Sequence, residues 1–265
     1  MKRLSFLVCL SLLVTVSAGA SDGVLVPIFF DGPGSNGSSW FTRLVIFNNS
    51  DRPLQGIQFT FFDCPIPEFC SAPIPPRSSF TATTAPNTNF NNGFFLFPGI
   101  EQPDVWYVLR VIDTSRLVLN EGTDVPVVPL DSFSEKTLQL LDVPADDLSR
   151  MTLRIYGIPP ATPRVRVTVF QDAQATFSQP LPPQLLSEHF YDLAIPQSPS
   201  PATGSFSRPS GAVISNLFDP ATTATPRHVR IEVQSTTPGA PIWALASVTN
   251  DASQAVTIIA PRPSP

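Results

Sequence analysis

Alternating hydrophobic and polar residues recur in short segments along this chain, and each segment predicts a β-strand. In residues 228–235, HVRIEVQS, valine and isoleucine alternate with charged and polar residues, so one face of the strand is buried and the other is wet. Two more apolar runs, 242–248 and 255–259, follow after sequences rich in turn formers. We therefore expect residues 228–261 to form an antiparallel meander of three strands that lines a sandwich.

The same alternation predicts strand pairs elsewhere in the chain. Residues 40–61 contain two alternating runs joined by a turn rich in Asn, Asp and Pro, and residues 105–119 contain a second such pair. Residues 151–172 repeat the first layout, with strand, proline-containing turn and strand. Because the layout recurs, we predict an all-β protein of two consecutive immunoglobulin-like antiparallel β-sandwich modules, residues 21–122 and 123–265.

Residues 179–210 depart from this pattern because they are rich in Pro and Ser. We expect this loop to be mostly irregular, with no more than a helical turn or two in QLLSEHFYDL. Its aromatic residues, Phe190 and Tyr191, either pack back onto the sandwich or contact a ligand, and packing is the commoner role.

The three tryptophans lie within apolar strand segments. Trp40, Trp106 and Trp243 are each flanked by Phe, Ile, Val, Tyr or Ala. We therefore expect all three in the structural core, and not in a flat row of exposed aromatics of the kind that would support carbohydrate binding.

The first 20 residues have the features of a secretory signal peptide. Lys2 and Arg3 precede an apolar stretch at 4–16, and Ala18 and Ala20 mark a cleavage site. The apolar stretch is shorter than the roughly 20 residues that a membrane span needs. We therefore expect an exported protein without a membrane span, located in the periplasm, at the cell surface or outside the cell.

Export favours a disulfide between Cys64 and Cys70, since the third cysteine, Cys9, lies in the leader. The loop that this bond would close is short, so it would stabilise the fold by roughly 2 kcal/mol. The alternative is metal ligation, but two thiols without a nearby histidine make a poor zinc site.

Composition supports the β assignment and excludes some partners. The chain has 31 prolines and only 14% charged residues, which disfavours long amphipathic helices. Its formal net charge of −5 becomes more negative once Lys2 and Arg3 are removed, and Lys136 is then the single lysine. Such a chain repels phosphate backbones on average, so nucleic acid is not an expected partner.

No constellation of residues predicts catalysis. The two histidines, His189 and His228, are far apart in the sequence, and no serine lies in a G-x-S-x-G elbow. The densest acidic group, Asp142, Asp146 and Asp147, suits turns or helix caps better than calcium, because the D-x-[DN]-x-[DN]-G loop is absent. We therefore expect no enzyme activity, no metal and no cofactor.

Three arginines offer a candidate binding surface together with Phe190 and Tyr191. Arg154, Arg166 and Arg230 fall on the polar sides of their predicted strands. If these strands are neighbours, they form a basic stripe for an acidic glycan or carboxylate-rich polymer. The competing interpretation is a solvated sheet face balanced by Glu232.

Three segments, 26–62, 138–156 and 228–261, together resemble bacterial exported proteins of unknown function built from tandem immunoglobulin-like sandwich modules. The resemblance implies fold and export, and brings no catalytic residue with it. We expect a non-catalytic exported protein for surface adhesion, matrix assembly or binding of a glycan or another envelope or extracellular protein. The alternative is an accessory binding module for an extracellular carbohydrate- or peptide-processing system.

Overall fold

The computed structural model describes residues 23–34, 37–54, 73–83, 89–90, 93–96, 104–115, 122–171, 182–195, 209–215, 217 and 228–264. These residues form four antiparallel sheets and contain no α-helix. The predicted all-β class is therefore confirmed, and the four sheets are consistent with two sandwich units. The leader with Ala18 and Ala20, and the pair Cys64 and Cys70, lie outside the described residues.

The first unit holds two of the sheets. Its strands are β1 (Val24–Val26), β2 (Phe29–Pro33), β3 (Ser39–Asn48), β4 (Ser78–Thr83), β5 (Asn89–Phe90), β6 (Phe94–Leu96), β7 (Val105–Asp113), β8 (Thr123–Val125) and β9 (Val128–Pro129). The three-stranded sheet has the order β6-β1-β9. The six-stranded sheet has the order β5-β2-β3-β7-β8, and β4 pairs with β3 beside β2. Because β8 and β9 pair with β7 and β1, residues 123–129 belong to this unit, beyond the expected boundary at 122/123.

The second unit begins with a short 3-10 helix and holds the other two sheets. Its elements are η3 (Leu130–Ser132), β10 (Leu138–Pro144), β11 (Ser149–Gly157), β12 (Arg164–Gln171), β13 (Gln184–Asp192), β14 (Ser210–Ser215), β15 (His228–Ser235), β16 (Ile242–Asn250), β17 (Val256–Ile259) and β18 (Arg262–Pro263). The five-stranded sheet has the order β13-β12-β15-β10-β18, and the four-stranded sheet has the order β14-β11-β16-β17.

The core of the second unit lies between these two sheets. The predicted inward residues of β15, Val229, Ile231 and Val233, are buried there against β16 residues such as Ala244 and Ala246. Alternate valines of β12 are buried on the same side. Period-two patterning therefore identified the buried faces of these strands correctly.

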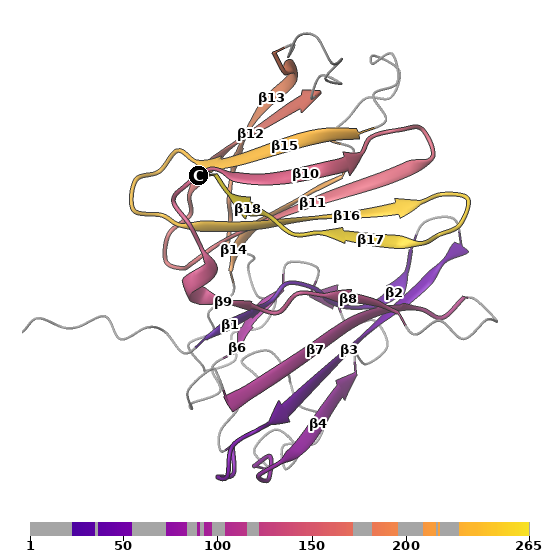
Figure 1. Cartoon of the computed structure of the whole chain (residues 1–265), viewed down its shortest axis with the longest axis vertical. Coiled ribbons are helices and arrows are strands. Elements are labelled where there is room, and N and C mark those ends of the chain that lie inside the picture. The colour runs from indigo at the N-terminus through magenta and orange to yellow at the C-terminus, as the bar shows by residue number, and fades with distance from the viewer. Residues whose placement is uncertain are drawn as a thin grey trace, which may run out of the picture.

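The four-stranded sheet is buried on both of its faces. One face belongs to the core of the second unit, while Tyr156, Trp243 and Leu245 on the other face join the hydrophobic core of the first unit. Figure 1 shows this sheet (β14, β11, β16, β17) lying between the five-stranded sheet above and the strands of the first unit below. The second unit therefore contributes residues to the core of the first unit, while its own core lies between its two sheets.

The predicted C-terminal meander is wrong in its pairing. β16 and β17 form the expected hairpin, but β15 pairs with β12 and β10 in the opposite sheet. Likewise β11 pairs with β14 and β16, whereas β12 pairs with β13 and β15, so the strands of the expected hairpin over 151–172 lie in different sheets. Alternation shows that one side of a strand is buried. Because strands of both sheets in a sandwich show the same alternation, the pattern does not say which sheet a strand joins.

Residues 179–210 contain a strand where irregular chain was expected. β13 pairs with β12 over its whole length, for example Tyr191 with Val165 and Phe190 with Arg166. It lies at the edge of its sheet and most of its side chains are exposed. An edge strand is held by backbone pairing on one side, so its sequence shows little of the burial pattern that identifies inner strands. The return arms expected at 57–61 and 116–119 lie outside the described residues.

Candidate functional site

Two predicted binding residues, Arg166 and Arg230, share the outer face of the five-stranded sheet. Arg166 on β12 lies between Phe190 on β13 and Gln234 on β15. Its guanidinium donates to the side-chain oxygen of Gln234 at 2.6 Å and lies 3.7 Å from a carboxylate oxygen of Glu188. The charge of Arg166 is therefore already balanced by a neighbouring strand.

The charge of Arg230 is also balanced by a carboxylate of the same sheet. It forms an ion pair with Glu232 on its own strand, and its guanidinium lies over the ring of Phe170, 4.6 Å from the centroid. Gln139 on β10 donates to the same Glu232 carboxylate at 3.1 Å. The competing expectation, a solvated face balanced by Glu232, describes this side of the sheet better than a free basic stripe.

Arg154 does not join the other two arginines. It lies on β11, in the four-stranded sheet, where it donates to the hydroxyl of Ser247 at 2.9 Å. Its Nε is buried without a hydrogen-bond partner, and desolvation lowers the pKa of the guanidinium. The predicted stripe of Arg154, Arg166 and Arg230 is therefore wrong, because a strand pattern does not say which sheet a strand joins.

The two predicted loop aromatics point to opposite sides of β13. Phe190 is exposed on the outer face, where the guanidinium of Arg164 lies 5.4 Å from its ring centroid. Tyr191 packs against the core of the second unit, and burial raises the pKa of its hydroxyl. Only Phe190 is therefore available to a ligand.

Of the three tryptophans, only Trp243 lies fully in the core. Trp40 is half-buried and donates from its indole nitrogen to the hydroxyl of Ser38 at 2.8 Å. Trp106 is 58% exposed, so its predicted core position is wrong. The reason lies in the sequence of β7, VWYVLRV, which is mostly apolar on both faces, so that Arg110 alone marks the outer one.

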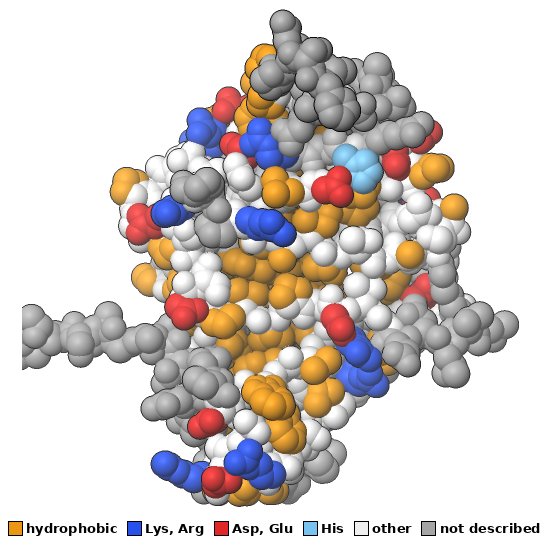
Figure 2. Space-filling view, in the orientation of Figure 1, with side chains coloured by type: hydrophobic (Ala, Val, Ile, Leu, Met, Phe, Trp, Pro, Cys, Tyr) orange, Lys and Arg blue, Asp and Glu red, His pale blue; other side chains and the backbone are white. Residues whose placement is uncertain are grey.

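Trp106 forms part of an exposed apolar surface on the outer face of the six-stranded sheet. It lies opposite Phe47 of β3, with ring centroids 5.5 Å apart and a tilt of 34° between the rings. The next outward pair is Val45 and Val108, and Val108 is 44% exposed. Figure 2 shows hydrophobic side chains exposed over β7 on the face toward the viewer. We call Phe47, Trp106, Val45 and Val108 the aromatic platform.

A polar row borders the platform on the same sheet face. Arg43 of β3 lies opposite Arg110 of β7, with Thr83 of β4 on one side and Asp124 of β8 on the other. Arg110 donates from Nε to the Asp124 carboxylate at 2.6 Å. The row therefore places donors and acceptors beside Val45 and Val108, at the opposite end of the platform from the rings, and a hydroxyl-rich ligand requires both kinds of group.

The turn after β3 fixes the end of the platform. The side-chain amide of Asn48, which is buried, donates to the carbonyl oxygens of Arg52 at 2.7 Å and of Ile74 at 3.0 Å. Its oxygen accepts from the backbone amide of Ser50 at 3.0 Å. Because Asn48 follows Phe47 directly, these bonds hold the strand end that carries the Phe47 ring.

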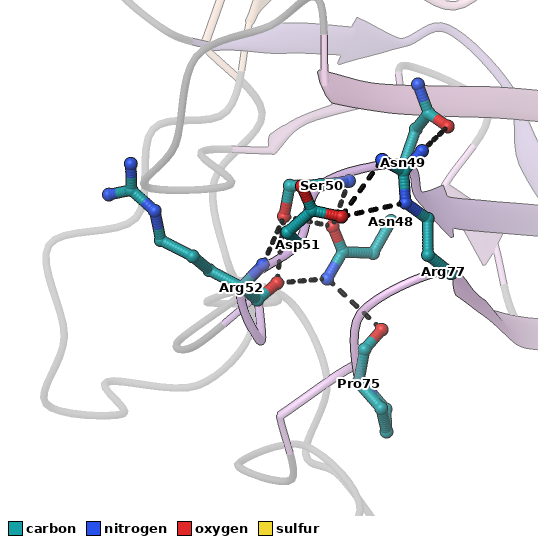
Figure 3. Close-up of polar contacts among 7 residues, drawn as sticks. All are labelled: Asn48, Asn49, Ser50, Asp51, Arg52, Pro75 and Arg77. Atoms are coloured by element: carbon teal, nitrogen blue, oxygen red, sulfur yellow. Dashed lines mark hydrogen bonds and ion pairs between the residues drawn. The ribbon is translucent and has the colours of Figure 1, made fainter.

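Arg77 closes the same turn from the far side. It donates to the side-chain oxygens of Asn49 at 2.8 Å and of Asp51 at 3.0 Å, as Figure 3 shows. Arg77 itself has a left-handed backbone with φ of 54°. These contacts pair the side chains of Asn49 and Asp51 within the turn, so the turn acts as a support for the platform.

The histidines do not come together. His189 is exposed on β13 with its ring 6.2 Å from that of Tyr191, and His228 forms a contact of 2.9 Å with the carboxylate of Asp142. No hydroxyl side chain is among the partners of His228 in the part of the chain that the structure describes. That part also holds no group of three or more His, Cys, Asp or Glu residues arranged to bind a metal.

A groove lies where the two units meet. This groove of about 650 Å³ is lined by hydrophobic residues that include Phe133, Trp243 and Pro261, and by Lys136. It is open to solvent, and its lining also includes Asp131, Ser132 and Ser134. Over the described ranges, no helix has the length and hydrophobicity to cross a membrane.

The chain matches no protein-family model, no curated protein and no solved structure. Sequence reasoning missed the platform, although one signal was present. Trp106 and Arg110 are four residues apart in a strand and must share a face, and the charge of Arg110 marks that face as the outer one.

Proposed function

We propose that this protein is a non-catalytic, exported binding protein that uses the aromatic platform to hold an extracellular glycan, in surface adhesion or matrix assembly. One observation carries the proposal: Trp106 is 58% exposed and lies 5.5 Å from the ring of Phe47 on the outer face of a sheet. Large aromatic side chains are normally buried, so an exposed Trp106 beside a half-buried Phe47 on a sheet face indicates a binding surface.

A sheet face suits a polysaccharide because both surfaces are extended. The C–H face of one sugar ring can stack on Trp106 or Phe47, while hydroxyls of a later ring in the same chain bond to the polar row at the other end of the platform. An apolar protein partner would need a larger hydrophobic surface than these four side chains, and it would not need the mixed row that holds Arg110 and Asp124. The mixed chemistry therefore favours a glycan.

The finer assignment of the fold is part of the same proposal. We infer that the two sandwich units are immunoglobulin-like modules of a bacterial exported protein, with residues 1–20 as a signal peptide and Cys64 paired with Cys70. The support is the antiparallel two-sheet construction of each unit and the arrangement of charged, apolar and small residues at the N-terminus. In such modules, surfaces and loops carry the contacts while the sheets supply the rigid support.

A glycan array tests the function with two matched variants. Residues 21–265 are expected to bind a subset of glycans, and Trp106→Ala is expected to lower the affinity by about 2- to 13-fold, since stacking on one aromatic ring contributes about 0.5–1.5 kcal/mol. The control is Leu148→Ala, which removes another exposed apolar side chain on the second unit. Wild-type protein that binds no glycan, or Trp106→Ala protein that binds as the wild type does, would overturn the proposal.

A further inference from the structure

We propose that the platform selects a polysaccharide that carries carboxylate groups, and that Arg43 binds one of these carboxylates. This inference rests on the proposed glycan-binding function and adds the ligand's charge. The sequence predicted an acidic ligand at Arg154, Arg166 and Arg230. The inference places such a ligand at Arg43, on the six-stranded sheet.

Arg43 differs from Arg110, Arg166 and Arg230 in having no partner among the described residues. It is half-buried on the outer face of β3, and within the described residues its side chain makes no hydrogen bond and no ion pair. Its cross-strand neighbour Arg110 is paired with Asp124 at 2.6 Å. A cation that is partly removed from water and lacks an internal anion is the group whose charge an anionic ligand would satisfy.

The position of Arg43 along the strand fits a stacked sugar chain. Arg43 and Phe47 are four residues apart on β3, so their Cα atoms are separated by about 13 Å. Val45 and Val108 occupy the outward position between them. A short oligosaccharide could therefore stack one ring on Phe47 and Trp106, cross the two valines, and place a carboxylate of a later ring at Arg43.

The surroundings of Arg43 strengthen such a contact. An apolar floor on one side excludes water, and an arginine fork can hold a carboxylate through two parallel hydrogen bonds. The hydroxyl of Thr83, opposite Arg43 on β4, is a further donor or acceptor at the strand edge. Asp31 on β2, which lies opposite Phe41 of β3, carries a carboxylate on the same sheet face and makes no ion pair with Arg43.

The five-stranded sheet offers the matched contrast. Arg166 and Arg230 on its outer face are paired with Glu188 and Glu232, so an acidic ligand there would have to displace carboxylates of the protein itself. The chain as a whole is acidic, which repels a polyanion at long range. Selective binding of a carboxylated glycan therefore requires a local, unpaired cation beside a stacking surface, and the platform supplies both.

The test compares two ligands that differ only in charge. Calorimetry on residues 21–265 would use oligogalacturonate and its fully methyl-esterified form, which keeps the sugar rings but removes the carboxylates. We expect wild-type protein to bind the acidic form at least tenfold more tightly, because a hydrogen bond to a charged group contributes about 1.5–3 kcal/mol. Arg43→Gln should abolish this preference, and Trp106→Ala should weaken both ligands.

Two controls separate a local effect from general electrostatics. Arg166→Gln removes the same charge from the other sheet face and should leave both affinities unchanged. Asp31→Asn removes the carboxylate on the same sheet face and should leave binding of the acidic form equal or tighter. The inference would be overturned if wild-type protein bound the two ligands equally and Arg43→Gln left both affinities unchanged. If Trp106→Ala still weakened binding in that case, the proposed glycan function would stand. No binding of either ligand, together with an empty glycan array, would overturn both.

Discussion

The hydroxyl of Tyr156 donates a buried hydrogen bond of 2.7 Å to the carbonyl oxygen of Pro27, and these two residues belong to different units. The Tyr156 ring also lies 5.9 Å from that of Trp243, which packs into the core of the first unit. Pro27, which follows β1, is thus hydrogen-bonded to β11, an inner strand of the four-stranded sheet. This contact and the shared core predict that the two units unfold together.

Replacing Tyr156 with Phe should lower the free energy of unfolding by about 1–3 kcal/mol, because the carbonyl of Pro27 would be left buried without a donor. Urea denaturation followed by circular dichroism would measure the change, and both forms should show a single transition. The control is Tyr191→Phe, because Tyr191 packs against the core of the second unit and removal of its hydroxyl should change stability by less than about 0.5 kcal/mol. Two separate transitions in the wild type would contradict the shared core.

High pH should destabilise the fold through its tyrosines. Burial raises the pKa of Tyr107 and of Tyr156 well above the ordinary value of about 10. The folded state therefore favours the neutral phenol, and this stabilisation is complete below about pH 10 and is lost as the pH rises toward the folded-state pKa values. Absorbance of tyrosinate should rise together with unfolding, and Tyr107→Phe should reduce the loss of stability with pH. Full ionisation of all tyrosines while the protein remains folded would refute the prediction.

Arg154→Met should raise the free energy of unfolding by about 1 kcal/mol, since it replaces a desolvated guanidinium that has one unpartnered nitrogen with an apolar side chain of similar length. The control is Arg164→Met, because Arg164 is exposed and its contact of 3.9 Å with Asp192 is a weak surface ion pair. Thermal and urea unfolding would measure both variants. A loss of stability in Arg154→Met would show that the single bond to Ser247 outweighs the burial of the charge.

Gly93→Ala should destabilise the first unit by more than about 3 kcal/mol. Gly93 has φ of 65°, and a Cβ atom there would lie 2.4 Å from the carbonyl oxygen of Val26. Gly239, with φ of 71° and no atom within 4 Å of an added Cβ, is the matched control, and Gly239→Ala should cost only about 1 kcal/mol. Equal losses in the two variants would show that the backbone angle alone, and not the contact with Val26, sets the cost.

Much of the strand content was predictable because alternation is a local property. The inward residues Leu44 and Ile46 of β3 and Val167 of β12 are buried as the pattern requires. Where both faces of a strand are apolar, the same rule fails. In β7 it placed Trp106 in the core, and the structure exposes it.

The candidate site was predictable only in part, because it depends on which strands become neighbours. Arg166 and Arg230 do share a sheet face, but Arg154 lies in another sheet, and the carboxylates that neutralise the first two come from β13 and β15. Phe47 and Trp106 are far apart in the sequence and meet only through the register of β3 with β7. No local pattern encodes that meeting.

By itself, the sequence determined that this chain forms short strands with one wet and one buried side, because side chains alternate across a strand whatever it pairs with. Only the tertiary structure decided which strands pair, that the four-stranded sheet is covered on both faces, and that Arg43 and the aromatic platform share a surface. The physical reason is that pairing partners are chosen by the packing of the whole chain, through contacts between residues that are distant in sequence.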